Sequence, residues 1–288
     1  MKDYFRLIRV SQWVKNLFVF LPVVFSGNLF NETYLVFSIL IFVTFSFISS
    51  SVYVLNDYMD IESDRNHPQK KNRPLASGKI TKREAVTLFL TLITLSILFL
   101  YLFANLATSV TILIYLLINV AYSFGAKHIA IIDVSIISFG FLLRVFAGGF
   151  MTGITISNWT ILLTFTIAMV MAFGKRRGEL VNVQGKNKTR KALDGYNLEF
   201  LNSALVISCV MTIVCYVMYT MAPETQSKMH HYVFYTFIFV IVGVLRYLQQ
   251  TFVFNKTESP TKMVFKDLFL QITIFLWGIS MLLVIYLK

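Results

Sequence analysis

The chain has 288 residues, of which 57% are hydrophobic and only 14% are charged. This composition excludes an ordinary soluble domain and is typical of a protein that crosses a membrane several times. The formal net charge of +12 comes from cations gathered beside apolar segments, a pattern of membrane topology and not of nucleic-acid binding. Membrane lipids are therefore expected partners, and nucleic acid is not.

Apolar segments of membrane-spanning length follow one another through the chain. They predict an all-α, polytopic membrane protein with a single catalytic domain over residues 1–288. The first expected span contains Pro22 and Gly27, which disfavour a regular helix. No signal peptide is expected, because no small-residue cleavage site follows the first basic residues. Nine transmembrane helices are expected at about residues 17–30, 34–56, 85–103, 106–122, 130–151, 159–174, 200–221, 231–253 and 267–286.

The basic residues predict the orientation of these helices. If the N-terminus is cytoplasmic, all but four of the 26 Lys and Arg residues lie in cytoplasmic segments. Of the four, Lys228 and Lys288 fall on the opposite side, whereas Arg144 and Arg246 fall within helical segments or at their ends. We therefore expect a multi-pass protein of the plasma (inner) membrane whose N-terminus and active site face the cytoplasm.

Three aspartates end the second expected helix. Asp57, Asp60 and Asp64 follow Asn56 at spacings that place them on one face of a helix. Like charges so close to a bilayer repel one another, so a cation is expected to neutralise them. Carboxylate oxygens suit Mg²⁺, which usually binds through one or two carboxylates together with substrate phosphates. The pattern predicts a Mg²⁺–diphosphate site; the alternative is a solvated acidic helix end.

Cations in the loops on the same side are candidates to hold phosphate oxygens beside these acids. Arg73 precedes Pro74, which restricts its backbone, and is the better candidate in the loop after the aspartates. Lys127 lies in the short loop that follows Tyr122, where it could reach a phosphate or anchor the topology. The cations interpreted as topological anchors are Lys70, Lys71, Lys82 and Arg83.

Lys175, Arg176 and Arg177 follow one another at the end of the sixth expected helix. They are either phosphate ligands or charges that meet the negative end of the helix dipole. Glu179 is expected to hold a second metal cation or to pair with an arginine of this group.

Arg144 lies in the middle of the fifth expected helix. A charge at that depth is costly unless it is paired or hydrated, so it is expected to contact a substrate or to form a structural ion pair. Lys15 and Asn16 follow Trp13 in an interfacial segment, where a Lys and a Trp are expected as anchors. The alternative is that Lys15 and Asn16 point into a cavity open to the cytoplasm.

The sequence Asn-Asp-x-x-Asp-x-x-x-Asp from Asn56 to Asp64 resembles the first aspartate-rich motif of the UbiA superfamily of intramembrane prenyltransferases. The nine expected helices and Arg73-Pro74 agree with it, so the resemblance covers essentially the whole chain. It implies a UbiA-like bundle with a cytoplasm-facing active site, and it is consistent with a homo-oligomer. Members usually carry a second motif, DxxxD, between helices 6 and 7, where this chain has Lys-Arg-Arg-x-Glu-Leu instead.

Cations in place of the second acidic motif suggest further phosphate groups in the site. The stretches Gln12–Asn16, Tyr122–Phe124 and Gly174–Leu180 are similar to the decaprenyl-phosphate phosphoribosyltransferase branch of the superfamily. This resemblance implies transfer of 5-phosphoribose from 5-phosphoribosyl diphosphate to a polyprenyl phosphate. The product, polyprenyl-phosphoryl-5-phosphoribose, would serve cell-envelope polysaccharide synthesis.

The candidate site follows from the motifs and the resemblance together. Lys15 and Arg144 are candidates to hold the acceptor phosphate, whereas the loop cations could hold either the donor 5-phosphate or the acceptor phosphate. Residues expected to act in catalysis are Asp57, Asp60, Asp64 and Arg144, with the three aspartates as Mg²⁺ ligands. Residues expected to bind substrate are Lys15, Asn16, Asn56, Arg73, Tyr122, Lys127, Lys175, Arg176, Arg177 and Glu179.

Two other functions are considered. An aromatic prenyltransferase with a polyprenyl diphosphate donor would share the first motif, but the missing second acidic motif argues against it. A lipid transporter could have the same number of helices, but transport gives no reason for three aspartates at the cytoplasmic end of a helix.

Overall fold

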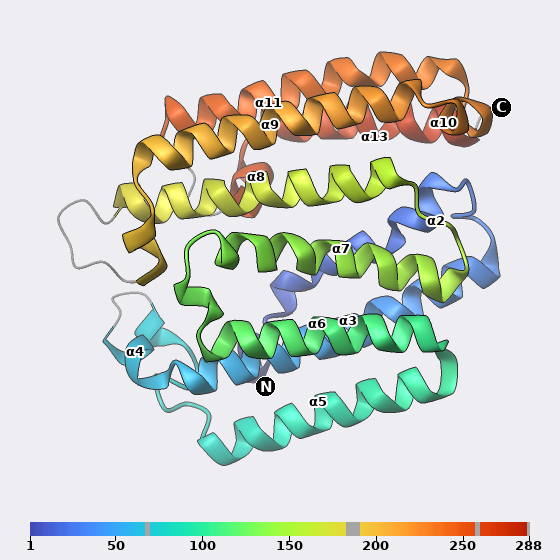
Figure 1. The fold of residues 1–288 in the computed structure, drawn as a ribbon. Helices are drawn as coiled ribbons and strands as arrows, with labels where there is room; N and C mark the ends of the chain where they lie inside the picture. Colours follow the sequence, from blue (N-terminus) through green and yellow to red (C-terminus); the bar gives the residue numbers. More distant parts are fainter. Residues whose placement is uncertain (67–69, 183–190, 257–259, 287–288) are drawn as a thin grey trace. The chain divides into compact units, whose positions relative to one another are not determined.

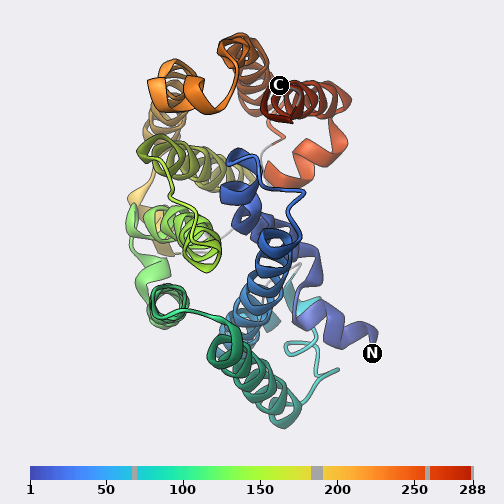
Figure 2. The same ribbon diagram turned by 90° about the vertical axis from the view of Figure 1, so that its right-hand side faces the viewer.

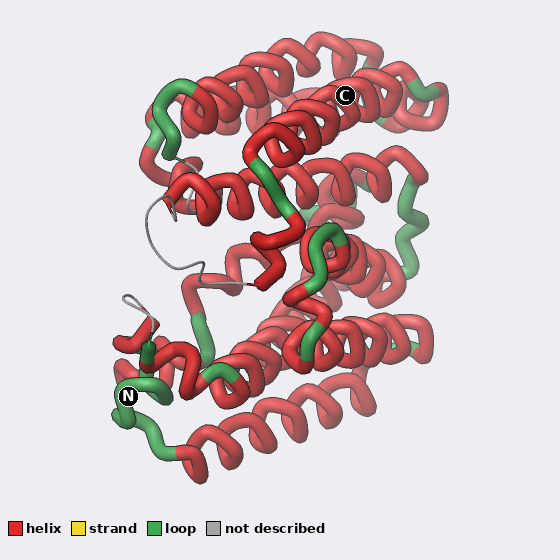
Figure 3. The backbone as a smooth tube through the Cα atoms, turned by 60° about the vertical axis from the view of Figure 1, so that its left-hand side comes forward, coloured by secondary structure: helices red, strands yellow, loops and turns green. Residues whose placement is uncertain are grey.

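The computed structural model describes residues 1–66, 70–182, 191–256 and 260–286. Helices and their connections make up these ranges, which contain no strand (Figure 3). Among the described residues, eight helical segments are long and apolar enough to cross a membrane. They are α3 Glu32–Met59, α5 Lys82–Phe103, α6 Leu106–Phe124, α7 Ile132–Thr152, α8 Asn158–Asn182, α9 Leu198–Met221, η5 and α11 together over His231–Phe252, and α13 Leu268–Tyr286.

Eight of the nine expected spans therefore match long helices. The first expected span is instead a shorter apolar segment, Val10–Phe25. It consists of a 3₁₀ helix, η1 Val10–Phe20, followed by α2 Leu21–Phe25. Pro22 stands at the start of α2, where a missing N–H costs little, and Gly27 adopts a φ of 78° just beyond its end. The two residues that disfavour a regular helix therefore mark the start and the end of the short helix α2.

Short helices connect the longer ones. They are α1 Lys2–Leu7, α4 Ile61–Arg65, η2 Lys70–Asn72, η3 Ala126–His128, η4 Lys191–Gly195, α10 Pro223–Lys228 and α12 Pro260–Lys266, while η5 itself covers His231–Thr236. Side-chain caps fix several helix starts. Asn31 caps α3 and Asn105 caps α6. Thr81 and Glu84 form a capping box at α5, which satisfies two backbone donors at the start of that helix.

The chain divides into two compact units. The first contains residues 1–127 and 140–156, and the second contains residues 128–139 and 157–288. Helix α7 contributes its first part to the second unit and its later part to the first. The single catalytic domain expected from the sequence stays a prediction.

In the first unit, α3 packs against α5, α6 and η1 (Figures 1 and 2). The core between them includes Phe45 of α3 and Tyr115 of α6. Gly148 of α7 lies against the backbone of Val19 in η1: a Cβ built on this glycine would stand 2.0 Å from the Val19 carbonyl oxygen. A residue with a side chain therefore does not fit at position 148 without separating the two segments.

In the second unit, α8 packs along α9, and α9 packs on α11, which in turn packs on α13. Figure 1 shows these helices in yellow-green, orange and red. Their core includes the buried side chains of Phe173, Leu201, Leu205 and Tyr247. Cys209 also belongs to this core, and both it and Cys215 are buried free thiols, consistent with packing roles.

Candidate functional site

The acidic end of α3 forms the centre of the candidate site in the first unit. Helix α3 ends at Met59, Asp60 stands between the helices with φ −95° and ψ 9°, and α4 begins at Ile61. The three aspartates therefore lie on two successive helices, and not on one continuous helix. Helical hydrogen bonds still hold the turn, because Asp60 N donates to Asn56 O at 3.0 Å and Asp64 N donates to Asp60 O at 2.8 Å.

Asp57 and Asp64 share the guanidinium of Arg73. Its Nη1 lies 3.1 Å from Asp57 Oδ1 and 2.7 Å from Asp64 Oδ2. Both carboxylates are buried, at 2% and 3% exposure. Arg9 donates from its Nη2 to the same Oδ1 of Asp57. The structure thus brings Arg73 to the aspartates as expected, and it adds Arg9.

Sequence reasoning missed Arg9, which counted only as one of the cations of a cytoplasmic N-terminus. It caps η1 in the left-handed conformation, with φ 52°, and its guanidinium lies over the Tyr53 ring at 4.7 Å. A left-handed non-glycine residue is uncommon. The sequence around it carries no signal for that conformation.

Asp60 pairs with Lys127. The Lys127 ammonium lies 2.6 Å from Asp60 Oδ1 and 3.4 Å from Asn56 Oδ1, and it is 7% exposed. Asn56 donates from Nδ2 to Asp60 Oδ2 at 3.2 Å, which orients the carboxylate. Lys127 is therefore buried against an acid of the candidate site, whereas a topological anchor would be solvated.

Three carboxylates and the three cations Arg9, Arg73 and Lys127 therefore form one compensated cluster. Among the residues that the structure describes, no group of three or more His, Cys, Asp or Glu side chains is gathered as a metal cage. Mg²⁺ does not need one, since it commonly takes one or two carboxylates together with substrate phosphates. Asp57 and Asp60, one helical turn apart, and Asn56 supply hard oxygen donors of that kind. The donor set fits Mg²⁺ provided that the cations give up carboxylate oxygens to it.

Arg144 lies deeper in the first unit and is 5% exposed. It donates from Nε to Asn16 Oδ1 at 2.9 Å, from Nη1 to Gly140 O at 2.7 Å and from Nη2 to Tyr115 Oη at 3.1 Å. Its guanidinium also lies 4.8 Å from the centre of the Phe45 ring. All of these partners are uncharged. The structural ion pair considered for Arg144 is not present among the described residues.

Asn16 is buried, at 1% exposure, and its expected position in a cavity open to the cytoplasm stays a prediction. Its Nδ2 donates to Ser46 Oγ at 3.0 Å and to Ser49 Oγ at 3.2 Å on α3. Trp13 likewise donates to Ser50 Oγ at 3.0 Å. The hydroxyl groups of α3 therefore fix the orientation of the segment that carries Lys15.

Lys15 is half-buried beside this amide. It forms no hydrogen bond or ion pair with any described residue, and the charges that act on it are those of Arg144 and Arg9. Three cations thus influence one another, and Arg9 alone has an acidic partner among the residues that the structure describes. Because such an arrangement repels itself in a partly dry interior, an anion between Lys15 and Arg144 would stabilise it.

A separate buried network occupies the second unit. Arg176 is fully buried and donates from Nε to Asp133 Oδ2 and from Nη1 to Glu179 Oε2, both at 2.5 Å. Tyr196 donates to Asp133 Oδ1 at 2.8 Å and accepts from the Ile131 N–H. Burial and this bond to Asp133 raise the pKa of Tyr196. Arg176, which was expected to bind phosphate, is thus held in two ion pairs. Glu179 pairs with an arginine, which was one of the two partners considered for it.

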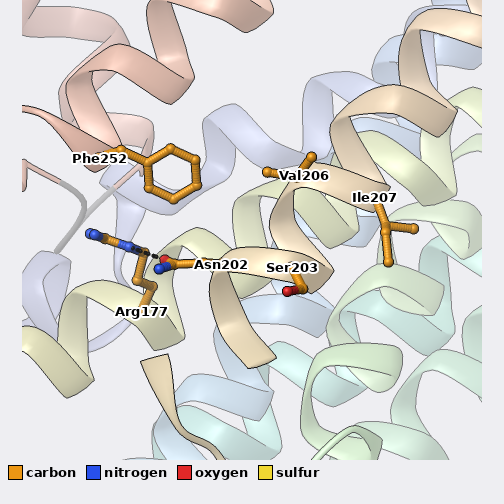
Figure 4. Close-up of a pocket in the computed structure, with 6 residues that line it drawn as sticks. All are labelled: Arg177, Asn202, Ser203, Val206, Ile207 and Phe252. Atoms are coloured by element: carbon orange, nitrogen blue, oxygen red, sulfur yellow. Dashed lines mark hydrogen bonds between the residues drawn. The ribbon is translucent and has the colours of Figure 1, made fainter. Parts of the chain in front are cut away.

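Three further residues were expected to bind substrate. Lys175 is half-exposed and lies 4.0 Å from Glu179. Tyr122 is half-buried in the last turn of α6, in the first unit. Arg177 lines an open pocket of the second unit (Figure 4). Their expected contacts with substrate stay predictions.

Comparison with known proteins finds a family model and relatives that point to the same family. The sequence model of the UbiA prenyltransferase family matches residues 17–279. The chain is 30% identical over 287 residues to a decaprenyl-phosphate phosphoribosyltransferase of Corynebacterium glutamicum, a match that covers 98% of this chain and 86% of the relative. It is 32% identical to the protein of the same name from Mycolicibacterium smegmatis, over 94% of this chain and 89% of the relative.

Solved structures share the fold. A UbiA homolog from Archaeoglobus fulgidus bound to DMAPP and Mg²⁺ matches with a TM-score of 0.71 and 19% identity, over 98% of this chain and 99% of that one. The same homolog bound to GPP and Mg²⁺ matches with a TM-score of 0.70 over 97% and 96%. Since the family model matches most of the chain and full-length relatives agree with it, the chain belongs to the UbiA prenyltransferase family.

Proposed function

We propose that this protein transfers 5-phosphoribose from 5-phosphoribosyl diphosphate to a polyprenyl phosphate, giving polyprenyl-phosphoryl-5-phosphoribose and diphosphate. Similarity along the whole chain to proteins named decaprenyl-phosphate phosphoribosyltransferase supports this reaction. The observation that carries it is the presence, in one unit, of a metal-compatible acidic cluster and of two further cations, Lys15 and Arg144, without an acidic partner among the described residues. An acceptor that is itself a phosphate requires such cations, whereas an uncharged aromatic acceptor does not.

The donor diphosphate binds at the end of α3. Asp57 and Asp60 would hold Mg²⁺ there, with Asp64 and Asn56 beside them, and when bound the ion supplies Lewis-acid stabilisation of the leaving diphosphate. Arg73, Arg9 and Lys127 neutralise these carboxylates in the structure. Once the carboxylates are otherwise neutralised, the same cations are free to donate to phosphate oxygens, where charge builds as the reaction proceeds.

The acceptor phosphate binds between Lys15 and Arg144. The carbonyl of Gly140 and the side chains of Asn16 and Tyr115 fix the Arg144 guanidinium, so little side-chain freedom is lost when it binds an anion. The acceptor phosphate is already ionised at neutral pH and needs no strong general base. One of its oxygens forms a bond to C1 of the ribose while the bond from C1 to the diphosphate oxygen breaks, with inversion at C1.

The proposal includes the setting of the reaction. The positive-inside rule supports a cytoplasmic position for the segments that carry the acidic cluster and most of the cations, and we propose the plasma membrane as the site of the reaction. The polyprenyl tail remains in the lipid, and the product supplies cell-envelope polysaccharide synthesis. We further propose that the protein works as a homo-oligomer, which the family resemblance supports.

A donor comparison with purified protein and Mg²⁺ tests the proposal. One reaction receives labelled 5-phosphoribosyl diphosphate and a polyprenyl phosphate, and the other receives a polyprenyl diphosphate and a panel of aromatic acceptors. We expect labelled phosphoribosyl lipid in the first reaction and no product in the second. Product in the second reaction alone would show that the protein is an aromatic prenyltransferase.

A further inference from the structure

An open pocket lies at one end of the second unit, between α8, α9 and α11 (Figure 4). Its volume is about 550 Å³. The lining residues are Arg177 of α8, Asn202, Ser203, Val206 and Ile207 of α9, and Phe252 of α11. Since α8 and α11 end near these residues and α9 begins near them, the pocket lies close to helix ends, and the ends of membrane-spanning helices are expected at the membrane–water interface.

Arg177 gives this pocket a positive charge that none of the described acids compensates. It donates from Nε to Asn202 Oδ1 at 2.7 Å, and from Nη1 to Thr251 O at 2.8 Å and to Asn255 Oδ1 at 3.2 Å. Its guanidinium also lies 5.1 Å from the centre of the Phe252 ring. All of these partners are neutral, and no described acid forms an ion pair with Arg177.

Two other arginines of the same unit do form ion pairs with acids, in contrast to Arg177. Arg176, the preceding residue, is paired with Asp133 and Glu179. Arg246, on α11, is paired with Asp267 at 2.8 Å. Arg177 is 7% exposed, and a cation so largely withdrawn from water is stabilised by an anion. The pocket in front of it is the space in which an anion can reach it.

The pocket is polar at one end and apolar at the other. Figure 4 shows the Arg177 guanidinium with Asn202 and the Phe252 ring at one end, and Val206 and Ile207 further along α9. Val206 is 39% exposed and Ile207 is 63% exposed. They follow Ser203 by three and four residues, so they continue the same helix face. A ligand that fits both ends has a phosphate group and a hydrocarbon chain.

We propose that this pocket binds the headgroup of an anionic phospholipid, with its phosphate at Arg177 and its acyl chain along Val206 and Ile207. Basic pockets between membrane helices are known to receive such headgroups. The site lies wholly in the second unit, and the proposal does not depend on the reaction proposed above. The phosphate chemistry is shared with free phosphate and with a polyprenyl phosphate, which the test must separate.

Native mass spectrometry of the detergent-solubilised full chain tests the proposal. The protein is titrated with phosphatidylglycerol, with phosphatidylcholine of the same acyl chains, with inorganic phosphate and with a polyprenyl phosphate. We expect phosphatidylglycerol to bind at least about tenfold more tightly than phosphatidylcholine, as one charge-assisted contact provides. Arg177→Gln should remove this preference, and Arg83→Gln, which removes an exposed cation of the first unit, should leave it unchanged.

A second variant separates binding from folding, because Arg177 also links three helices. Ser203→Trp fills the middle of the pocket and leaves every hydrogen bond of Arg177 in place, so it should also abolish the preference. Retention of the preference in Ser203→Trp would overturn the proposal. Displacement of phosphatidylglycerol by equimolar inorganic phosphate would reassign the pocket to a free anion, and preferential displacement by the polyprenyl phosphate would reassign it to the acceptor; either result also overturns it.

Discussion

Lys127 places its ammonium 2.6 Å from the carboxylate of Asp60, a residue 67 positions earlier in the chain. The pair joins the short loop after α6 to the end of α3, and it occupies an oxygen that the proposed Mg²⁺ would need. Lys127 therefore competes for the proposed metal ligand, and in the proposed function it is also a cation for the substrate phosphate.

This dual position predicts an uncommon kinetic result for Lys127→Gln. The Mg²⁺ concentration that gives half-maximal activity should fall, because Asp60 no longer holds an ammonium. The KM for 5-phosphoribosyl diphosphate should rise about tenfold, because a charge-assisted contact to phosphate is lost. Initial rates measured over a grid of Mg²⁺ and donor concentrations separate the two effects. Lys79→Gln, which removes an exposed cation, is the control; equal behaviour of the two variants would contradict the role of Lys127.

Asp60→Asn should reduce turnover on the order of 10²-fold or more, because it removes a negative oxygen donor at the site of the leaving group. Asp60 is partly exposed, at 26% of its side chain, but the change takes this acid from the buried Lys127, so the variant should unfold at a lower temperature than the wild type and its turnover should be measured where it is still folded. Glu62→Gln is the matched control, since this neighbouring acid has a side chain that is 78% exposed and pairs only with Arg65. Near wild-type turnover in Asp60→Asn would show that the aspartate cluster has another purpose.

Arg144→Gln should raise the KM for the polyprenyl phosphate about tenfold or more and leave the KM for the donor close to that of the wild type. Asn16 contacts the Arg144 guanidinium directly at 2.9 Å, so the effects of Arg144→Gln and Asn16→Ala should be less than additive in the double variant. Steady-state kinetics of the four proteins checks this. Additive effects, or a rise in the donor KM instead, would argue against a shared acceptor site.

The buried pair of Asp133 and Arg176 predicts a large effect on stability. Asp133→Asn leaves the guanidinium with a single, partly exposed acid, so the free energy of unfolding should fall by roughly 3–5 kcal/mol. The double variant Asp133→Asn, Arg176→Met should recover part of the loss, because the buried guanidinium is gone and the partly exposed Glu179 keeps Lys175 as a neighbour at 4.0 Å. Thermal unfolding in detergent measures both. If the double variant is less stable than Asp133→Asn, the loss does not come from an unpaired charge.

Asp267 predicts a pH dependence at the start of α13. Its bonds to Arg246 and to the Leu270 N–H lower its pKa below the ordinary value of 3.8. A carboxyl group with a lowered folded-state pKa stabilises the fold fully above its ordinary pKa and loses that contribution as the pH falls through the folded-state value. The wild type should therefore lose more stability than Asp267→Asn when the pH falls from neutral to below 4. Parallel unfolding curves for the two proteins would contradict this.

Local patterns in the sequence predict much of this fold and part of the site. Hydropathy alone locates the eight long helices, since a membrane span needs about 20 apolar residues. Arg73 is found near the aspartates because it follows Asp64 by only nine residues, in a loop restricted by Pro74. Contacts between residues that lie far apart in the sequence could not be predicted in this way. Nothing local indicates that Arg9 lies against Asp57 or that Lys127 lies against Asp60.

The run of three cations in α8 shows that a pattern of charges in the sequence does not predict which partner each cation has. Lys175, Arg176 and Arg177 read as one group, yet Arg176 is enclosed by acids and Arg177 is turned to neutral partners. Adjacent positions on a helix point about 100° apart, so adjacent charges meet different neighbours. Only the packing of α8 against its own unit decides which cation stays available.

The contact between Gly148 and Val19 also bears on the size of the anion that the proposed acceptor site admits. Val19 follows Lys15 by four residues in the 3₁₀ helix η1, and Gly148 follows Arg144 by four residues in α7, so each cation stands little more than one helical turn before this contact. The glycine lets the two segments meet backbone to backbone, so no side chain holds them apart at this point. A methyl group at position 148 would push the segments apart, and in the proposed acceptor site we expect it to weaken the simultaneous contact of one phosphate with both cations.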